Sequence, residues 1–427
     1  GVPASLVANF GLRHWIGVEV ARQSGVVTMQ VSDVAGLVTR YARRLHEAAG
    51  DQHHVASPLG AWLLLALCGP AAQGEERRAL EDVLGCGAEE AASVAGELLE
   101  QSHPLVGAAV AVWNRGGAGG QRWLSGLPAA VERGPIPSQD EADAWVREHS
   151  FGLINGFPIS EATRYDLLLA SVLATKVSWD RPFELASGNA LGDTSPWSKQ
   201  VKQVLVSPLA PPQADLHKAF LASTEEAGEV GVHVGRAQCG LLVASVIGAA
   251  DVPAVNVLAA GHRIAMDVAL SRPVAMRSLF DLPLGDGPFW SVREGMSPAG
   301  PGERCRAVLP AWEARSTHAL GGERLGFAAA AGALGGGDSW EATQAAMARY
   351  TRFGFEAAAV TAMAVLVSMP MPGMMRTGEL RFGHPYAVIA VAASDPDADP
   401  DSATNWPDRW NGVPVFSAWV AKPGEAE

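Results

Sequence analysis

The side chains that could carry out acid–base chemistry are scattered along the chain. They are Asp51, His53, His54, His149 and His318. General acid–base catalysis requires such groups within hydrogen-bonding reach of one substrate, and the sequence places no pair of them together. A single histidine more often has a structural role. The sequence therefore assigns no catalytic residue, and it favours a protein that is not an enzyme.

Side chains that bind metals are equally dispersed. Cys68, Cys86, Cys239 and Cys305 lie far apart without a CxxC motif or a paired histidine spacing, so neither a zinc site nor a disulfide framework is indicated. The segment 395–401 holds four aspartates, but its two prolines and its lack of glycine favour a solvated hairpin tip over a calcium loop. We expect no bound metal and no cofactor.

The most informative segment is an uncharged run over residues 357–375, which contains five of the ten methionines of the chain. Its length would suit a transmembrane helix, but Pro370 and Pro372 and the arginines on both sides argue against one. Exposed apolar surface in a globular protein is normally a binding site or a liability. The run therefore needs a functional explanation.

The composition limits the classes of protein to consider. The chain has 427 residues, 48% of them hydrophobic and 18% charged, which is too apolar for a disordered protein. Its net charge of −13 argues against nucleic acid or an anionic membrane as a partner. No signal peptide is visible, which predicts a cytoplasmic protein unless a leader was removed. We expect a monomer.

The expected elements change in character along the chain. Helical periodicity is concentrated in the first third, at residues 32–49, 59–68, 74–85, 91–102 and 139–154. Ser57 and Pro58 supply an N-cap and a first-turn proline for the second of these helices. Strand-like apolar runs follow at 167–177, 204–206, 231–234, 240–247, 264–270, 307–309, 386–392 and 413–420. This order predicts an α+β fold with large antiparallel or mixed sheets.

A series of short motifs occurs in order along the chain. They are Ser57-Pro58-Leu59, Gly74-Glu75 with Leu80 and Val83-Leu84-Gly85, Ala144-Trp145-Val146 with Gly152-Leu153-Ile154, 169–179 with Pro182-Phe183, Leu309-Pro310-Ala311-Trp312-Glu313, 354–359 and 382–386. In this order and at these distances they resemble the serpin family from about residue 30 to residue 423. The resemblance implies a divergent, bacterial-type member with one domain at 27–425 after an N-terminal extension at 1–26.

The resemblance also implies a fold and a mechanism. The fold is α+β, with three β-sheets, about eight to nine helices and a reactive-centre loop. A serine protease cleaves that loop and becomes acyl-linked to it, and the hinge side of the loop then inserts as a new strand into the main sheet. The matching hinge residues are Gly354, Phe355, Glu356, Ala357, Ala358, Ala359 and Thr361. Small side chains suit insertion, and about fifteen residues at ~3.3 Å each span roughly 50 Å.

The bait for the protease would lie in the Met-rich part of the loop. The candidates are Ser368, Met369, Met371, Met374, Met375 and Arg376. The spacing usual in the family, counted forward from Gly354, places the scissile bond at Ser368–Met369. The same comparison counted back from Phe382 places it near Met374 or Met375. Methionine suits a chymotrypsin- or elastase-like protease, and arginine suits a trypsin-like one. The loop is several residues longer than in familiar serpin inhibitors.

Two departures from the family pattern bear on this mechanism. Arg352 and Phe355 stand where an acidic residue and a Thr or Ser are usual, and a bulky Phe355 would slow entry of the hinge into the sheet. The family also has a polar cluster that controls opening of the main sheet. Its matching positions here are Ser57, Gly60, Ser171 and Gln344, and we group Trp179 with them.

These departures keep other functions open. The leading interpretation is a serpin-type suicide inhibitor with a serine protease as its partner. The alternative is a non-inhibitory serpin scaffold repurposed to bind or transform a small molecule, for example in a bacterial biosynthetic pathway. A third is an interaction module that presents residues 363–375 to a protein partner.

Overall fold

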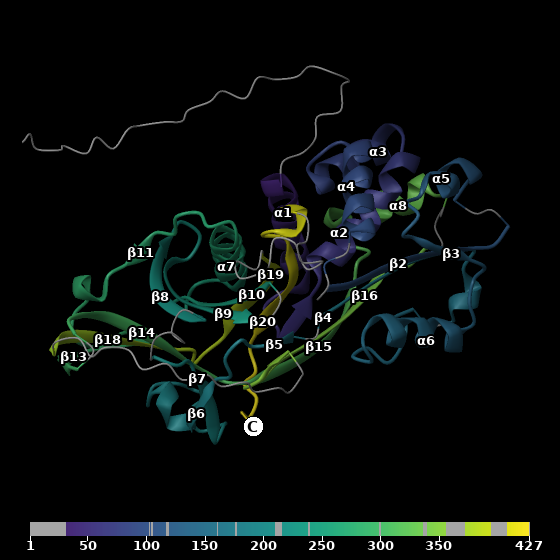
Figure 1. The fold of residues 1–427 in the computed structure, drawn as a ribbon. Coiled ribbons are helices and arrows are strands. Elements are labelled where there is room, and N and C mark those ends of the chain that lie inside the picture. The colour runs from purple at the N-terminus through teal and green to yellow at the C-terminus, as the bar shows by residue number, and fades with distance from the viewer. Residues whose placement is uncertain are drawn as a thin grey trace, which may run out of the picture.

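The computed structural model describes residues 31–101, 103, 106–116, 119–159, 161–175, 177–209, 216–237, 240–298, 300–335, 340–355, 372–393 and 408–426. Within these residues, eight α-helices combine with several groups of β-strands in a mixed α+β structure (Figure 1). This confirms the predicted fold class. None of the helices in the described ranges is both long and apolar enough to span a membrane.

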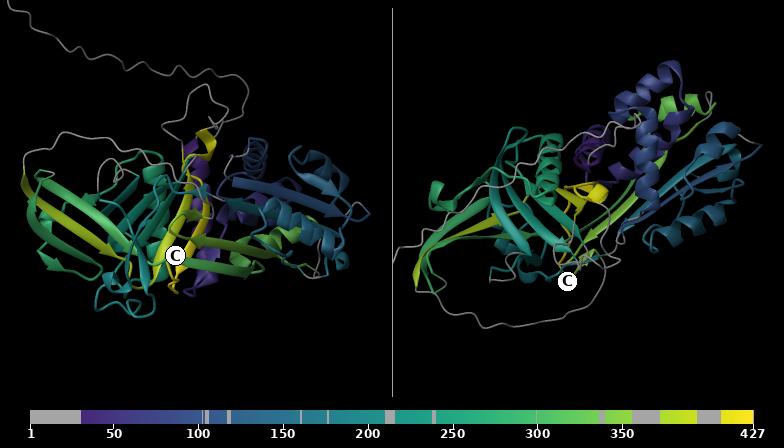
Figure 2. Two further views of the ribbon diagram at one scale, coloured as in Figure 1. Left: turned by 60° about the horizontal axis from the view of Figure 1, so that its bottom comes forward. Right: turned by 45° about the horizontal axis from the view of Figure 1, so that its top comes forward.

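Most of the helices gather at one end of the molecule, where α2, α3, α4, α5 and α8 lie together (Figures 1 and 2). The helices are α1 (Val31–Ala49), α2 (Pro58–Cys68), α3 (Gly74–Leu84), α4 (Ala88–Glu100), α5 (Gln121–Gly126), α6 (Gln139–His149), α7 (Ala254–Ala269) and α8 (Phe327–Ala333). Helix α6 ends earlier than the predicted 139–154 because Phe151 and Gly152 adopt positive φ angles of 53° and 75°.

Helix α2 is the buried centre of this group. The Ser57 side chain accepts a hydrogen bond from the Gly60 amide, and Pro58 occupies the first turn, as predicted. Every residue of the helix except Leu64 is buried, which agrees with a sequence that is apolar on all faces. Each large apolar side chain buried here contributes roughly 1.5–3 kcal/mol to stability. Helix α2 therefore forms a rigid support beneath the neighbouring strands.

A seven-stranded antiparallel sheet forms the centre of the molecule. Its order is β1 (His54–Ala56), β20 (Pro414–Val420), β19 (Tyr386–Ala392), β10 (Leu241–Ile247), β9 (Gly228–Ala237), β8 (His217–Thr224) and β11 (Met276–Arg277). Strands β19 and β20 are buried throughout, as their unbroken apolar sequences predict. Helix α7 packs on this sheet and shares an apolar core with it.

The predicted strand at 264–270 is wrong, because nearly all of these residues belong to α7. The buried side chains Val257, Leu258, Ile264 and Ala265 recur at helical spacing along one face. A short apolar run that contains β-branched residues cannot be separated from a buried helix by periodicity alone.

A six-stranded sheet extends to the far end of the molecule (Figure 2). Its order is β12 (Gly285–Asp286), β13 (Trp290–Ser297), β18 (Gly373–Arg381), β14 (Gly302–Leu309), β7 (Gln203–Val206) and β6 (Glu184–Ser187). Strand β18 runs antiparallel to β13 and parallel to β14, so both of its edges are paired.

The remaining strands extend beneath the helices in three smaller groups (Figure 1). They are β3 (Glu132–Gly134), β2 (Val106–Asn114) and β4 (Leu167–Thr175), then β15 (Trp312–Ala319) and β16 (Thr343–Tyr350), and finally β5 (Val177–Ser178) with β17 (Gly354–Phe355). Helix α6 covers β2 and β4, where Trp145 packs edge-to-face on Trp113 at 5.2 Å. The short β5–β17 pair joins the first group to the second.

Candidate functional site

Strands β4 and β16 are neighbours, yet no backbone ladder joins them in the part of the chain that the structure describes. Strand β4 pairs with β2 along one edge, and β16 pairs with β15 along one edge. A cavity of about 40 Å³ lies between them, lined by 169–172 of β4 and 343–345 of β16. Ala61 of α2 and Trp145 of α6 also line it. The two strands are therefore parted by a slot that reaches from α2 to α6.

The first turn of α2 holds both sides of this slot. The Ser57 amide donates to Oε1 of Gln344 at 2.9 Å, and Nε2 of Gln344 donates back to the Ser57 carbonyl at 2.9 Å. On the other side, the Ser171 hydroxyl donates to the Gly60 carbonyl at 3.1 Å. The structure thus brings Ser57, Gly60, Ser171 and Gln344 together. Each strand is tied to the helix rather than to the other strand.

At the base of the slot, one hydrogen bond spans the gap. The Tyr165 hydroxyl donates to Oε2 of Glu341 at 2.7 Å, and each residue lies just ahead of its strand. This bond to a carboxylate raises the pKa of Tyr165. Beside it lies a cavity of about 400 Å³ whose lining includes Cys68, Phe327 and Trp340.

At the opposite end, which we call the hinge end, the slot is closed. Gly354 pairs with Ser178 and Phe355 with Val177. The Trp179 amide donates to the Phe353 carbonyl at 3.0 Å, and the Trp179 indole donates to the Thr351 carbonyl at 3.0 Å. Trp179 therefore lies at the hinge end, whereas the sequence predicts it in the polar cluster at α2. Gly354 has a φ of 139°, a region that other residues rarely adopt.

Arg352, one of the residues that depart from the family pattern, also holds the predicted hinge end closed. Nε of Arg352 donates to the Phe183 carbonyl at 3.0 Å, and the Phe183 amide donates to the Arg352 carbonyl at 3.1 Å. The same guanidinium lies 5.2 Å from the centre of the Phe353 ring, which is 38% exposed. Arg352 thus stabilises the closed hinge in this structure. The predicted hinge residues Glu356, Ala357, Ala358, Ala359 and Thr361 lie outside the described residues.

Two stacked histidines lie beneath the hinge end. Nε2 of His217 donates to the Arg181 carbonyl at 2.6 Å, so its Nδ1 accepts from Nε2 of His233 at 3.1 Å. Burial lowers the pKa of His217 to about 4 and holds that of His233 well below its usual value. Phe183 packs on both rings. Two neutral imidazoles therefore support the residues that close the slot.

The predicted bait residues fall into two sets. Ser368, Met369 and Met371 lie outside the described residues, whereas Met374, Met375 and Arg376 belong to β18. The Arg376 guanidinium donates to Glu294 and to the Leu279 and Leu282 carbonyls, and it lies 4.9 Å from the centre of the Phe280 ring. A protease binds its substrate as a free extended segment. These contacts argue against the second set as bait.

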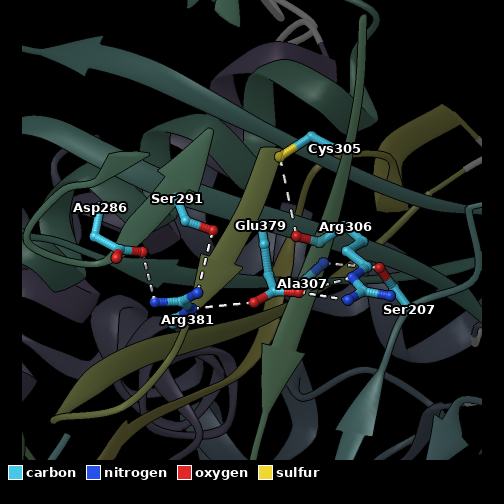
Figure 3. A network of polar contacts seen from close by, with 8 residues as sticks. All are labelled: Ser207, Asp286, Ser291, Cys305, Arg306, Ala307, Glu379 and Arg381. Carbon is cyan, nitrogen blue, oxygen red and sulfur yellow. Dashed lines mark hydrogen bonds and ion pairs between the residues drawn. The ribbon is translucent and has the colours of Figure 1, made fainter. Parts of the chain in front are cut away.

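Charged side chains strengthen the attachment of β18 (Figure 3). Glu379 accepts hydrogen bonds from Arg306 of β14 and from Arg381 of its own strand. Arg381 also donates to Asp286 at 3.0 Å and to the Ser291 hydroxyl at 3.2 Å. This network links β12, β13, β18 and β14 across the sheet.

The predicted acid–base candidates form no common site. Asp51 is exposed, His53 bonds the Glu313 carbonyl, and His149 pairs with Glu132 at 3.0 Å. His54 and His318, in contrast, lie with their rings 5.7 Å apart inside the molecule. They belong to a cluster with the buried His46 and His262. The approach of His262 and His318 to His46 and His54 depends on tertiary packing, because both are more than 200 residues away in the chain.

Comparisons with known proteins agree with this architecture. No family model and no curated protein matches the sequence. Among solved structures, human thyroxine-binding globulin complexed with thyroxine has a TM-score of 0.60 at 12% identity and covers 93% of this chain and 100% of that one. The thermophilic serpin tengpin in its native state has a TM-score of 0.60 at 13% identity, covering 92% and 94%. Native protease nexin-1 with heparin has a TM-score of 0.53 at 12% identity, covering 92% and 100%. The chain therefore has the serpin fold.

Proposed function

We propose that the chain is a serpin-type suicide inhibitor of a serine protease, acting through loop cleavage and strand insertion. The slot between β4 and β16 is the observation that carries this proposal. Both strands present an edge without a ladder partner among the described residues, and the segment 356–371 follows directly on β17. A new strand in the slot would pair with both edges.

The energy balance favours insertion. A strand as long as β16 would form about eight ladder hydrogen bonds with each edge, each with a net contribution of roughly 0.5–1.5 kcal/mol. Overpacking by Phe355 would oppose this with roughly 1–3 kcal/mol. The same residue would slow the first step of insertion, because the hinge enters the sheet first. A slow hinge gives the protease more time to hydrolyse its acyl bond and leave.

We propose Ser368–Met369 as the scissile bond. The forward count from Gly354 supports this position, and the engagement of Met374, Met375 and Arg376 in β18 argues against the alternative count. Ser368 supplies the side chain on the acyl side of this bond, and a small side chain there suits an elastase-like protease better than a chymotrypsin-like one. Trypsin-like enzymes, which would require Arg376, are expected to be poor targets.

Incubation with chymotrypsin and elastase tests the proposal. We expect an SDS-stable complex on gels and a large rise in melting temperature after cleavage. The variant Ala358→Arg places a charge in the part of segment 356–371 that would insert into the sheet, so the variant should be cleaved without forming a complex. The matched variant Ala398→Arg, in the acidic segment 395–401, should behave as the wild type. Cleavage of the wild type with neither a complex nor a raised melting temperature would contradict the proposal.

A second candidate function is the binding of a small molecule by a non-inhibitory serpin scaffold. It is supported by a cavity of about 730 Å³ between α1 and α7, a volume within the usual range of ligand sites. A structural neighbour, thyroxine-binding globulin, carries thyroxine in its solved complex. This function predicts that the melting temperature of the wild type rises with a small molecule, whether or not its loop inhibits a protease.

A further inference from the structure

The cavity of about 400 Å³ at the base of the slot lies against a helix that is otherwise fully buried. Leu64 is the one residue of α2 that is not buried, and it lines this cavity together with residues of α8 and the first residues of β4 and β16. Small-molecule sites in proteins usually have volumes of about 300–1,000 Å³ and mostly apolar walls. The space beside Leu64 is therefore large enough and apolar enough for a ligand.

Three aromatic side chains from three parts of the chain line this cavity. Tyr165 lies just ahead of β4, Trp340 lies just ahead of β16, and Phe327 is the first residue of α8. Each of them is only partly buried, which leaves part of its surface open to the cavity. The face of an aromatic ring attracts a positive charge, and tryptophan does so most strongly. Several such side chains around one space are typical of sites that bind an ammonium group.

Glu341 adds a carboxylate to the same lining. Its Oε2 accepts a hydrogen bond from the Tyr165 hydroxyl at 2.7 Å, and its Oε1 accepts one from the Thr343 hydroxyl at 3.3 Å. These two uncharged donors orient the carboxylate but leave its negative charge in place. A carboxylate can accept about four hydrogen bonds, so each oxygen keeps capacity for a further partner.

The other charges of the lining are balanced. Arg164 and Asp166 each have an ion-pair partner of opposite charge beyond the lining, at 3.2 Å and 3.5 Å. No ion pair of Glu341 is found within the part of the chain that the structure describes, and residues 325–348 contain no Lys, Arg or His. The cavity therefore combines three aromatic side chains with one negative charge that has no cation beside it in the sequence.

We propose that this cavity binds a small organic cation whose methylated ammonium group is held by Tyr165, Phe327 and Trp340 and by the Glu341 carboxylate. The ammonium carries methyl groups because the side chains of the wall are mostly aromatic or aliphatic. The apolar remainder of the ligand contacts Leu64 and α8. The inference goes beyond both proposed functions, since neither of them assigns a ligand to this cavity.

Isothermal titration calorimetry of the full-length protein with benzyltrimethylammonium tests this site. We expect saturable binding, and binding of benzyl alcohol or benzenesulfonate that is weaker by about tenfold or more, because neither carries a positive charge. Glu341→Gln removes the charge but keeps an acceptor for Tyr165, and it should weaken binding about five- to tenfold. Trp340→Leu should weaken binding about fivefold. Ala331→Trp fills the cavity and should abolish binding.

Two matched variants control for charge and for aromatic area outside the cavity. Glu323→Gln removes another exposed carboxylate, and Phe280→Leu removes another exposed ring. Both should keep the affinity of the wild type, and melting temperatures show which variants are folded.

Three results would overturn the proposal, and none of them depends on whether the chain inhibits a protease. Absence of saturable binding of benzyltrimethylammonium by the wild type contradicts the site as a whole. Benzyl alcohol that binds as tightly as the cation contradicts the choice of an ammonium ligand. Full affinity in both Glu341→Gln and Trp340→Leu contradicts the assignment to this cavity, even if Ala331→Trp fails to fold.

Discussion

The two ends of the segment 356–371 are held in very different ways. On the entry side, β17 forms only two residue pairs with β5, supported by bonds from Arg352 and Trp179. On the exit side, β18 is paired along both edges over most of its length and is tied by the Glu379 network (Figure 3). The entry side closes one end of the slot through a short pairing, whereas the exit side lies inside a complete sheet.

This contrast indicates which part of the molecule can move. Elements with few hydrogen bonds open at a lower free energy than elements inside a continuous sheet. Under the proposed mechanism, the hinge must leave its short pairing with β5 and enter the slot while β18 stays in place. The structure is consistent with that division, and four predictions test it in decreasing order of expected effect.

Acid should open the hinge end before it affects β18. Burial lowers the pKa of His217 to about 4 from the usual 6.5, so the unfolded chain takes up a proton more readily as the pH falls. The contribution of His217 to the free energy of unfolding is therefore complete above about pH 6.5 and is lost as the pH falls towards 4. For this histidine alone, about 2 kcal/mol is lost by pH 5. His103 and His262, whose pKa values are also lowered to about 4, add to the loss.

Urea unfolding at pH 7.5 and pH 5 measures the total effect, and amide hydrogen exchange shows where it begins. Trp179 and Phe183 should lose protection earlier than β18. The double variant His217→Phe with His233→Phe should reduce the pH dependence. Earlier exchange in β18 would reverse the proposed order.

Removal of the Glu379 carboxylate should weaken the exit side. Glu379→Ala leaves Arg306 and Arg381 without their shared acceptor in a partly buried site, so we expect the free energy of unfolding to fall by about 2–3 kcal/mol. Glu313→Ala is a matched control because Glu313 also lies between two arginines, but these are more exposed. It should cost about 0–1 kcal/mol. Equal losses for the two variants would count against a special role for β18.

Loss of the Gln344 amide should loosen one wall of the slot. Gln344→Ala removes both hydrogen bonds between β16 and Ser57, and we expect a loss of about 1–2 kcal/mol in unfolding free energy. Hydrogen exchange in β16 should accelerate, while that in β18 should not. Thr343→Ala, which changes the neighbouring residue, serves as the control. A uniform increase in exchange over both strands would show that the slot has no independent stability.

The smallest effect is expected at the base of the slot. Tyr165→Phe removes the hydroxyl that bonds Glu341, and a loss of about 0.5–1.5 kcal/mol is expected because the bond is partly solvated. Glu341→Gln keeps an acceptor and should cost less. Urea midpoints measure both variants. No change for Tyr165→Phe would mean that this bond does not hold the two strands.

Local features of the fold were predictable from neighbouring residues. Ser57 and Pro58 start α2, and the unbroken apolar sequences of β19 and β20 predict buried strands. Such signals depend on backbone preference and on the period of apolar residues over a few turns or pleats. These signals gave a wrong prediction at 264–270, because a short apolar run fits a buried strand and a buried helix equally well, and this run lies in α7.

By itself, the sequence determined the fold class, the order of the elements and the position of the uncharged segment 357–375, because these follow from local propensity and motif order. Only the tertiary structure decided that β4 and β16 are parted, that Arg376 is engaged in β18 and that His46 and His262 line one cavity. Each of these depends on groups distant in the chain, and their approach is set by the packing of whole elements rather than by any local pattern.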